Sequence, residues 1–130
     1  MEYLADTVAI VRYFSKSGKI GKRAFKILKD ADAGEHEIYV SIISIVEIMY
    51  LAERNRIPLR LEETLSKIAL SDNYHIVELD VDAIQNAKTI HGLELHDRLI
   101  VASARQLNLP ILTNDTVIVK SNMIEAIWDL

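Results

Sequence analysis

The sequence contains no cysteine among its 130 residues. Disulfide bonds, catalysis by a thiolate and cysteine-ligated zinc sites are therefore excluded. The absence also fits a reducing compartment, and we expect a cytoplasmic protein.

Long apolar runs are absent as well. No stretch approaches the roughly 18 uninterrupted apolar residues of a membrane span, and no basic segment followed by an apolar run marks a signal peptide. With only two prolines, four glycines and no low-complexity segment, the chain offers no linker, so we expect residues 1–130 to form a single domain. The net charge of −4 means that binding to nucleic acid would require a local basic surface or metal ions.

Apolar stretches typical of strands alternate with stretches of helical periodicity. Strands are predicted at residues 2–6, 37–42, 75–79, 109–115 and, at the end of the chain, 123–130. Helices are predicted from residue 8 onward and at residues 22–33, 44–55, 61–70, 80–91 and 95–108. This alternation predicts an α/β fold with helices packed on the faces of a parallel sheet.

Four acidic residues occur where this fold would bring distant segments together. Asp6 and Asp115 close predicted strands, whereas Glu47 and Asp97 lie in the first turns of predicted helices. Because open α/β sheets bind ligands beyond the carboxyl ends of their strands, these four carboxylates can meet at one edge of the sheet.

Three of the four acids also have possible structural roles. Glu47 forms a capping-box pattern with Ser44, Asp97 suits the positive end of a helix macrodipole, and Asp115 suits a turn. Asp6 has little structural purpose by comparison, because it ends a buried strand and precedes another apolar run.

Four carboxylates in one place would repel one another. At about 4 Å and an effective dielectric constant near 20, each pair costs roughly 4 kcal/mol, so such a cluster requires protonation or a bound cation. Oxygen ligands without cysteine suit Mg²⁺ or Mn²⁺ rather than zinc. A divalent ion held in this way polarises a phosphoryl oxygen and activates water, which leads to the hypothesis of metal-dependent phosphodiester hydrolysis.

The segments around these acids resemble those of PIN domains, specifically the small VapC-type toxins of prokaryotic type II toxin–antitoxin pairs. The matching segments are LADT around Asp6, SIISIVEI around Glu47, HDRLIVASA around Asp97 and ILTND around Asp115, and together they span essentially the whole chain. The third segment is the most specific, because its acid is followed by a hydrophobic pair and by small residues that let a helix pack closely. The chain departs from the family pattern at Val8, where a small polar residue is common, and after Asp115, where acidic and aromatic residues often follow.

The resemblance implies a three-layer α/β/α sandwich with a mainly parallel sheet, and an endoribonuclease that depends on Mg²⁺ or Mn²⁺. It assigns Asp6, Glu47, Asp97 and Asp115 to the metal-binding quartet. It places Thr113 at the polar position before the last acid, where the hydroxyl would orient a water or a neighbouring carboxylate. It also implies an RNA substrate, a homodimer and neutralisation by a cognate antitoxin.

The N-terminal position of Asp97 in its helix leads to one electrostatic expectation. The free amides of the first turn should favour the ionised, metal-binding form of this carboxylate.

Two other phosphate-handling folds fit less well. A phosphatase of the haloacid dehalogenase type typically carries a second acid two residues after the first, where this chain has Val8. A receiver domain typically carries adjacent acids near the first strand and an acceptor acid after the third, and neither is matched here. The alternative function is a non-catalytic PIN-like or receiver-type regulatory module that binds Mg²⁺.

Overall fold

The computed structural model describes residues 1–129, in which helices and strands alternate around one sheet. The elements are β1 (Glu2–Ala5), α1 (Thr7–Ser15), α2 (Lys22–Asp32), β2 (Glu37–Ser41), α3 (Ile42–Glu53), α4 (Leu61–Ala69), β3 (Tyr74–Val77), α5 (Val81–Lys88), α6 (Leu95–Leu107), β4 (Ile111–Leu112), α7 (Thr116–Ser121) and β5 (Ala126–Ile127). The strand order is β3-β2-β1-β4-β5, and each pair of neighbours is parallel. The predicted α/β fold with a parallel sheet is confirmed.

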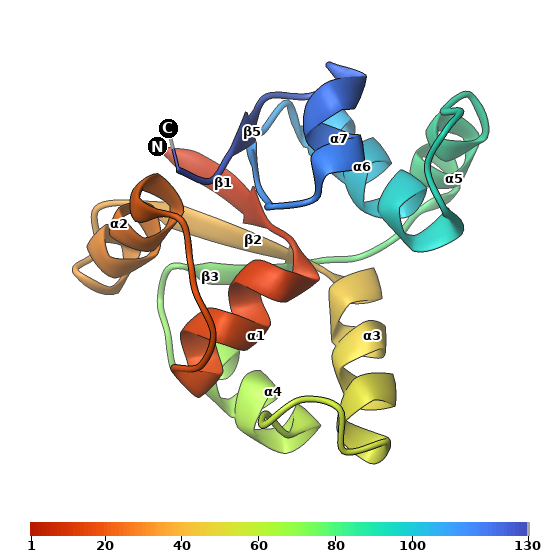
Figure 1. Cartoon of the computed structure of the whole chain (residues 1–130). Coiled ribbons are helices and arrows are strands. Elements are labelled where there is room, and N and C mark those ends of the chain that lie inside the picture. The colour runs from red at the N-terminus through yellow and green to blue at the C-terminus, as the bar shows by residue number, and fades with distance from the viewer. Residues whose placement is uncertain (130) are drawn as a thin grey trace.

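Side chains alternate between the two faces of β1 and so contribute to two separate cores. Tyr3 and Ala5 pack with apolar residues of α1 to α4, whereas Leu4 packs with apolar residues of α5, α6 and α7. Figure 1 shows α1, α3 and α4 on one side of the sheet and α5, α6 and α7 on the other. The molecule therefore has the three layers of an α/β/α sandwich.

The carboxyl ends of three neighbouring strands each carry a side chain that caps the next helix. Asp6 follows β1 and accepts a hydrogen bond from the Ala9 amide, and Ser41 ends β2 and accepts one from the Ile43 amide. Asp115 follows β4 and caps α7. Because β1 lies between β2 and β4 in the sheet, these three strand ends are adjacent.

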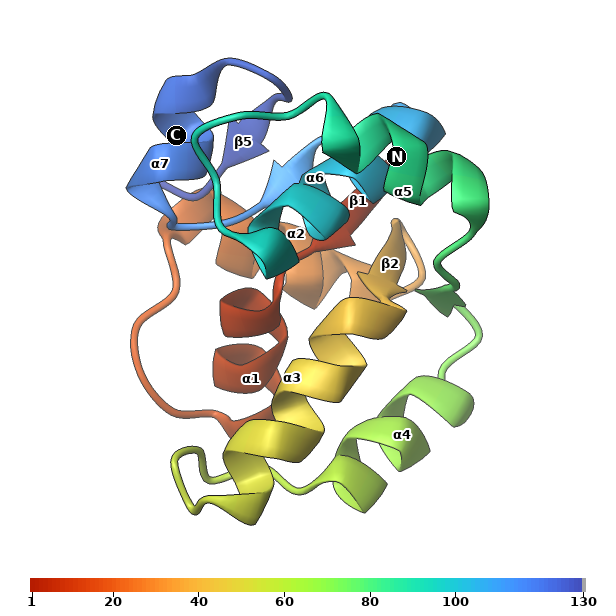
Figure 2. The same cartoon turned by 90° about the vertical axis from the view of Figure 1, so that its right-hand side faces the viewer.

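Helix α6 brings its first turn to the same edge. It leads into β4, which is parallel to the other strands, so α6 runs back across the sheet and starts at the carboxyl edge. It contacts α3, which in turn packs beside α1. Figure 2 shows α1 and α3 side by side with the first turn of α6 next to their N-terminal ends.

The structure differs from the prediction most clearly in three helices. Helix α3 begins at Ile42 with Ser41 as its cap, not at Ser44, because the Ser41 hydroxyl accepts the first free amide and ends the strand there. Helix α5 starts after Asp80 as predicted but ends at Lys88. Helix α7 was not predicted at all.

The predicted strand at the chain end is confirmed as β5. Leu130, the last residue of that predicted segment, lies outside the described residues. No helix within residues 1–129 is long and apolar enough to cross a membrane.

Candidate functional site

Asp6 is a buried carboxylate at the junction of β1 and α1. Only 7 % of its surface is exposed. Its Oδ1 accepts a hydrogen bond from the Ala9 amide at 3.0 Å, and the Thr113 hydroxyl also bonds to this carboxylate. Burial raises the pKa of Asp6 to about 6, against the opposing effect of these hydrogen bonds, and the charges of Asp115 and Glu47 raise it further. Asp6 thus has the capping role that the sequence did not suggest, and it has this role at an electrostatic cost.

Thr113 links Asp6 to Asp115 across the ends of β1 and β4. Its side chain is fully buried, and its Oγ1 accepts a hydrogen bond from the Asp115 amide at 3.0 Å. The Oδ1 atom of Asp115 accepts hydrogen bonds from the Val117 and Ile118 amides, at 2.9 and 3.2 Å. These contacts fix the strand–helix turn and leave Asp115 half-buried at the edge of the sheet.

Asp97 lies in the first turn of α6, but its ionised form is not favoured there. Its own amide is bonded to Oε1 of Glu94, the cap of α6, at 2.9 Å. Burial raises the pKa of Asp97 to about 6, and the charges of Asp115, Glu94, Glu47 and Asp6 raise it further. The expectation that the helix amides would favour the ionised form is therefore wrong, chiefly because the carboxylate is partly buried, and also because Glu94 occupies the Asp97 amide and adds a like charge.

Glu47 projects from the second turn of α3 and not from its first. The predicted capping box with Ser44 is absent, since Ser44 lies inside the helix and Ser41 is the cap. Instead, Oε1 of Glu47 accepts a hydrogen bond from the Thr7 hydroxyl at 2.6 Å, which ties α3 to the first residue of α1. The side chain is half-buried.

The four acids interact with one another although they come from four separate segments. Asp6 feels the charges of Asp115 and Glu47, and Asp97 feels those of the other three. Within residues 1–129, no three His, Asp or Glu side chains stand close enough to share an ion in their present positions. The acids converge on one region without forming a closed ligand shell, so binding an ion would require at least one of them to move toward it.

The chemistry of this region fits a divalent cation. All the donors are oxygen atoms, which Mg²⁺ and Mn²⁺ prefer. Two of the carboxylates have pKa values raised to about 6. Without a cation, each therefore keeps its proton at pH values well above those at which an ordinary aspartate ionises. A cation among them would replace those protons and remove the mutual repulsion.

Sequence reasoning missed three residues of this region: Thr7, Ser44 as a partner of Thr7, and Glu94. Thr7 directly follows the first acid, and Glu94 precedes Asp97 by three residues, which is the spacing of an N-cap to the third helical residue. That spacing was the available signal for Glu94. No local pattern relates Thr7 to Glu47, because the two are 40 positions apart.

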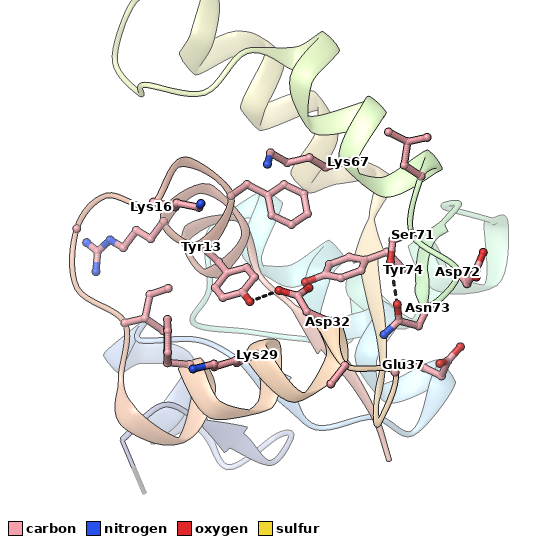
Figure 3. Close-up of a pocket in the computed structure, with 18 residues that line it drawn as sticks. Tyr13, Lys16, Lys29, Asp32, Glu37, Lys67, Ser71, Asp72, Asn73 and Tyr74 are labelled. Atoms are coloured by element: carbon pink, nitrogen blue, oxygen red, sulfur yellow. Dashed lines mark hydrogen bonds between the residues drawn. The ribbon is translucent and has the colours of Figure 1, made fainter.

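A large cavity lies elsewhere in the molecule. It has a volume of about 1450 Å³ and is bordered by α1, α2 and α4 and by the residues that lead into β2 and β3. Figure 3 shows Lys16, Lys29 and Lys67 among the side chains that line it, together with Tyr13, which is hydrogen-bonded to Asp32. It opens at the amino ends of the strands, and none of the four acids lines it. We place the candidate site at the acids, because that edge gathers the perturbed carboxylates.

The comparisons with known proteins agree with the fold. Residues 3–121 match the PIN domain family. A VapBC2 structure from Rickettsia felis bound to promoter DNA is similar, with a TM-score of 0.73, 18 % identity, and coverage of 99 % of this chain and 100 % of the other. DNA-bound VapBC from Salmonella typhimurium has a TM-score of 0.69 and 16 % identity, with coverage of 98 % of this chain and 97 % of the other. FitAcB from Neisseria gonorrhoeae has a TM-score of 0.58 and 21 % identity, with coverage of 97 % of this chain and 96 % of the other.

At these identities the likeness to solved structures is one of fold. No curated protein is similar enough in sequence to count as a relative. The family match is independent of that likeness and spans most of the chain, including the four acids. The chain belongs to the PIN domain family.

Proposed function

We propose that the chain is an endoribonuclease that depends on Mg²⁺ or Mn²⁺, and that it is the toxin of a toxin–antitoxin pair. The observation that supports this most is the convergence of Asp6, Glu47, Asp97 and Asp115 from four segments onto the carboxyl edge of a PIN-fold sheet. We also propose that residues 1–130 act as a single domain.

Each acid would contribute an oxygen to the metal, which when bound supplies electrophilic activation of a phosphoryl oxygen and a nucleophilic water at neutral pH. The Ala9 amide and the Thr113 hydroxyl hold Asp6, and the Val117 and Ile118 amides hold Oδ1 of Asp115. These contacts fix the direction of both side chains before a substrate arrives. Asp97 is more exposed and would border the path by which the phosphodiester enters.

The sharpest test is cleavage of a single-stranded RNA by the purified chain. We expect cleavage with Mn²⁺ or Mg²⁺, no cleavage in EDTA, and a loss of at least about 100-fold in Asp97→Asn. Asp72→Asn is the matched control, because Asp72 is an exposed acid beside the cavity at the other end of the sheet. Cleavage by Asp97→Asn at the wild-type rate would refute the proposal.

An antitoxin is the proposed protein partner. A similar structure from Klebsiella pneumoniae is named as a toxin–antitoxin complex, and by analogy this chain would be held inactive by a second protein. Expression of the chain alone should arrest growth, and co-expression of a neighbouring small open reading frame should restore it. If growth continues normally with the chain alone, a toxin role is excluded.

A homodimer is the proposed assembly, with the exposed face of α3 as its interface. Val46, Met49 and Tyr50 follow the i, i+3, i+4 spacing of one helical stripe, and Tyr50 is 51 % exposed. Light scattering should give twice the chain mass for the wild type and a lower mass for Tyr50→Glu. Leu70→Glu, at an exposed apolar residue after α4, is the control that should stay dimeric. A monomeric wild type would contradict this part of the proposal.

A further inference from the structure

Two buried hydroxyls connect α1 to the acid on α3. Thr7 is the first residue of α1, and it is buried directly beside Asp6 in sequence. Its Oγ1 lies 2.6 Å from Oε1 of Glu47 and 2.9 Å from the hydroxyl of Ser44, which is fully buried. The three side chains thus form a continuous chain of contacts between the two helices.

The direction of these hydrogen bonds follows from a count of hydrogens. Thr7 has one hydroxyl hydrogen, and an ionised Glu47 can only accept. The Thr7 hydroxyl is the donor in both contacts, and its hydrogen goes chiefly to Oε1 of Glu47, which is the shorter contact. A hydrogen bond to an ionised carboxylate is shorter and stronger than one between neutral groups.

The bond holds one oxygen of Glu47 and leaves the other available. Among the hydrogen bonds of residues 1–129, that to Thr7 is the only one made by the Glu47 side chain. Glutamate has three rotatable bonds and loses entropy when a ligand fixes it, so a bond that fixes it beforehand reduces that cost. Glu47 is also the longest and most flexible of the four acids, so it gains most from such support.

We propose that Thr7 is a positioning residue that presents the free oxygen of Glu47 to the metal; this inference rests on the proposed metal-dependent function. The residues that hydrogen-bond to metal ligands typically change metal affinity about 10- to 100-fold when they are replaced. The hydroxyl of Thr7 is therefore expected to matter for metal affinity without touching metal or RNA.

The test is Mn²⁺ binding to the purified full chain by titration calorimetry, with Mn²⁺ as the only added ligand. Thr7→Val keeps the shape and removes the hydroxyl, and it should weaken Mn²⁺ binding about 10-fold or more. Thr7→Ser restores the hydroxyl and should bind within about twofold of the wild type. Thr64→Val is the matched control: Thr64 is fully buried in α4 and bonds only to the Arg60 carbonyl, so its loss should leave Mn²⁺ affinity unchanged.

Each outcome decides one point. Wild-type Mn²⁺ affinity in Thr7→Val, or an equal loss in Thr7→Ser, would overturn the role of Thr7 while leaving the proposed function intact. If the wild type itself binds no Mn²⁺, the proposed function fails and this inference fails with it. If Thr7→Val does not fold, Thr7→Ala replaces it: a loss of Mn²⁺ affinity of about 10-fold supports the role of Thr7, and an unchanged affinity overturns it.

Discussion

The carboxylate of Asp6 should make the metal-free protein less stable at neutral pH, so that Asp6→Asn is stabilising. The pKa of Asp6 is raised from 3.8 to about 6, chiefly by burial. At about 1.4 kcal/mol per pH unit, the charged form costs the fold about 3 kcal/mol. Asparagine caps a helix about as well as aspartate, so the hydrogen bond from Ala9 can persist in the variant.

The sign and the pH window follow from the direction of this shift. Below the unfolded value of 3.8 the carboxyl is protonated in both states and costs nothing. As the pH rises from 3.8 to about 6, the folded wild type loses stability relative to Asp6→Asn, and above about 6 the difference is constant. For a chain of this size, about 3 kcal/mol corresponds to roughly 10 °C in melting temperature.

The assay is thermal unfolding in EDTA at several pH values, followed by circular dichroism. We expect Asp6→Asn to melt up to about 10 °C above the wild type near pH 8, and at the same temperature as the wild type near pH 4. A variant that melts below the wild type near pH 8, or a difference that does not shrink on acidification, would refute the electrostatic reasoning.

Three further predictions concern the metal, the pH dependence of activity and the packing of the tail. At a Mn²⁺ concentration of about 100 times its dissociation constant, the free energy of unfolding of the wild type should rise by about 3 kcal/mol. In the same melting assay, Asp6→Asn should lose most of this stabilisation. RNA cleavage at low Mn²⁺ should fall as the pH drops below about 6, because Asp6 and Asp97 then take up protons that compete with the metal; a flat profile between about pH 5 and 8 would contradict this. Gly21→Ala should destabilise the fold by about 1–3 kcal/mol in urea unfolding, since a Cβ there would lie 2.4 Å from the Trp128 carbonyl, and an unchanged midpoint would show that this contact relaxes freely.

The fold could be predicted because its signals are local and repeated. Strands such as β1 and β2 are short, buried and rich in apolar residues, and each is followed by a stretch of helical periodicity. Once the strands are parallel, the ends that face one edge of the sheet are fixed by topology. This is why four acids far apart in sequence could be expected in one region before any coordinates were known.

The errors arose where two local signals compete. Ile42 is β-branched and favoured extending the strand, but the Ser41 hydroxyl caps the helix and decides its start. Helix α7 has six residues, TVIVKS, whose composition is typical of a strand. Its stability comes from Asp115, which satisfies two amides at once, and from Ile118 buried in the core.

The electrostatics of the site could be predicted only in part. Mutual repulsion of the acids was anticipated, and the raised pKa values of Asp6 and Asp97 agree in direction, but burial is the larger cause for both. Burial of a single atom depends on long-range packing, and so does the bond between Thr7 and Glu47. Neither leaves a local pattern in the sequence.

The most direct test is the position of Mn²⁺ in crystals of the wild-type chain soaked in MnCl₂, found by anomalous diffraction. The account predicts a peak enclosed by Asp6, Glu47, Asp97 and Asp115 at the carboxyl edge of the sheet, and no such peak in crystals of Asp97→Asn. Full Mn²⁺ occupancy at another place on the protein, with these four carboxylates left without metal, would contradict it.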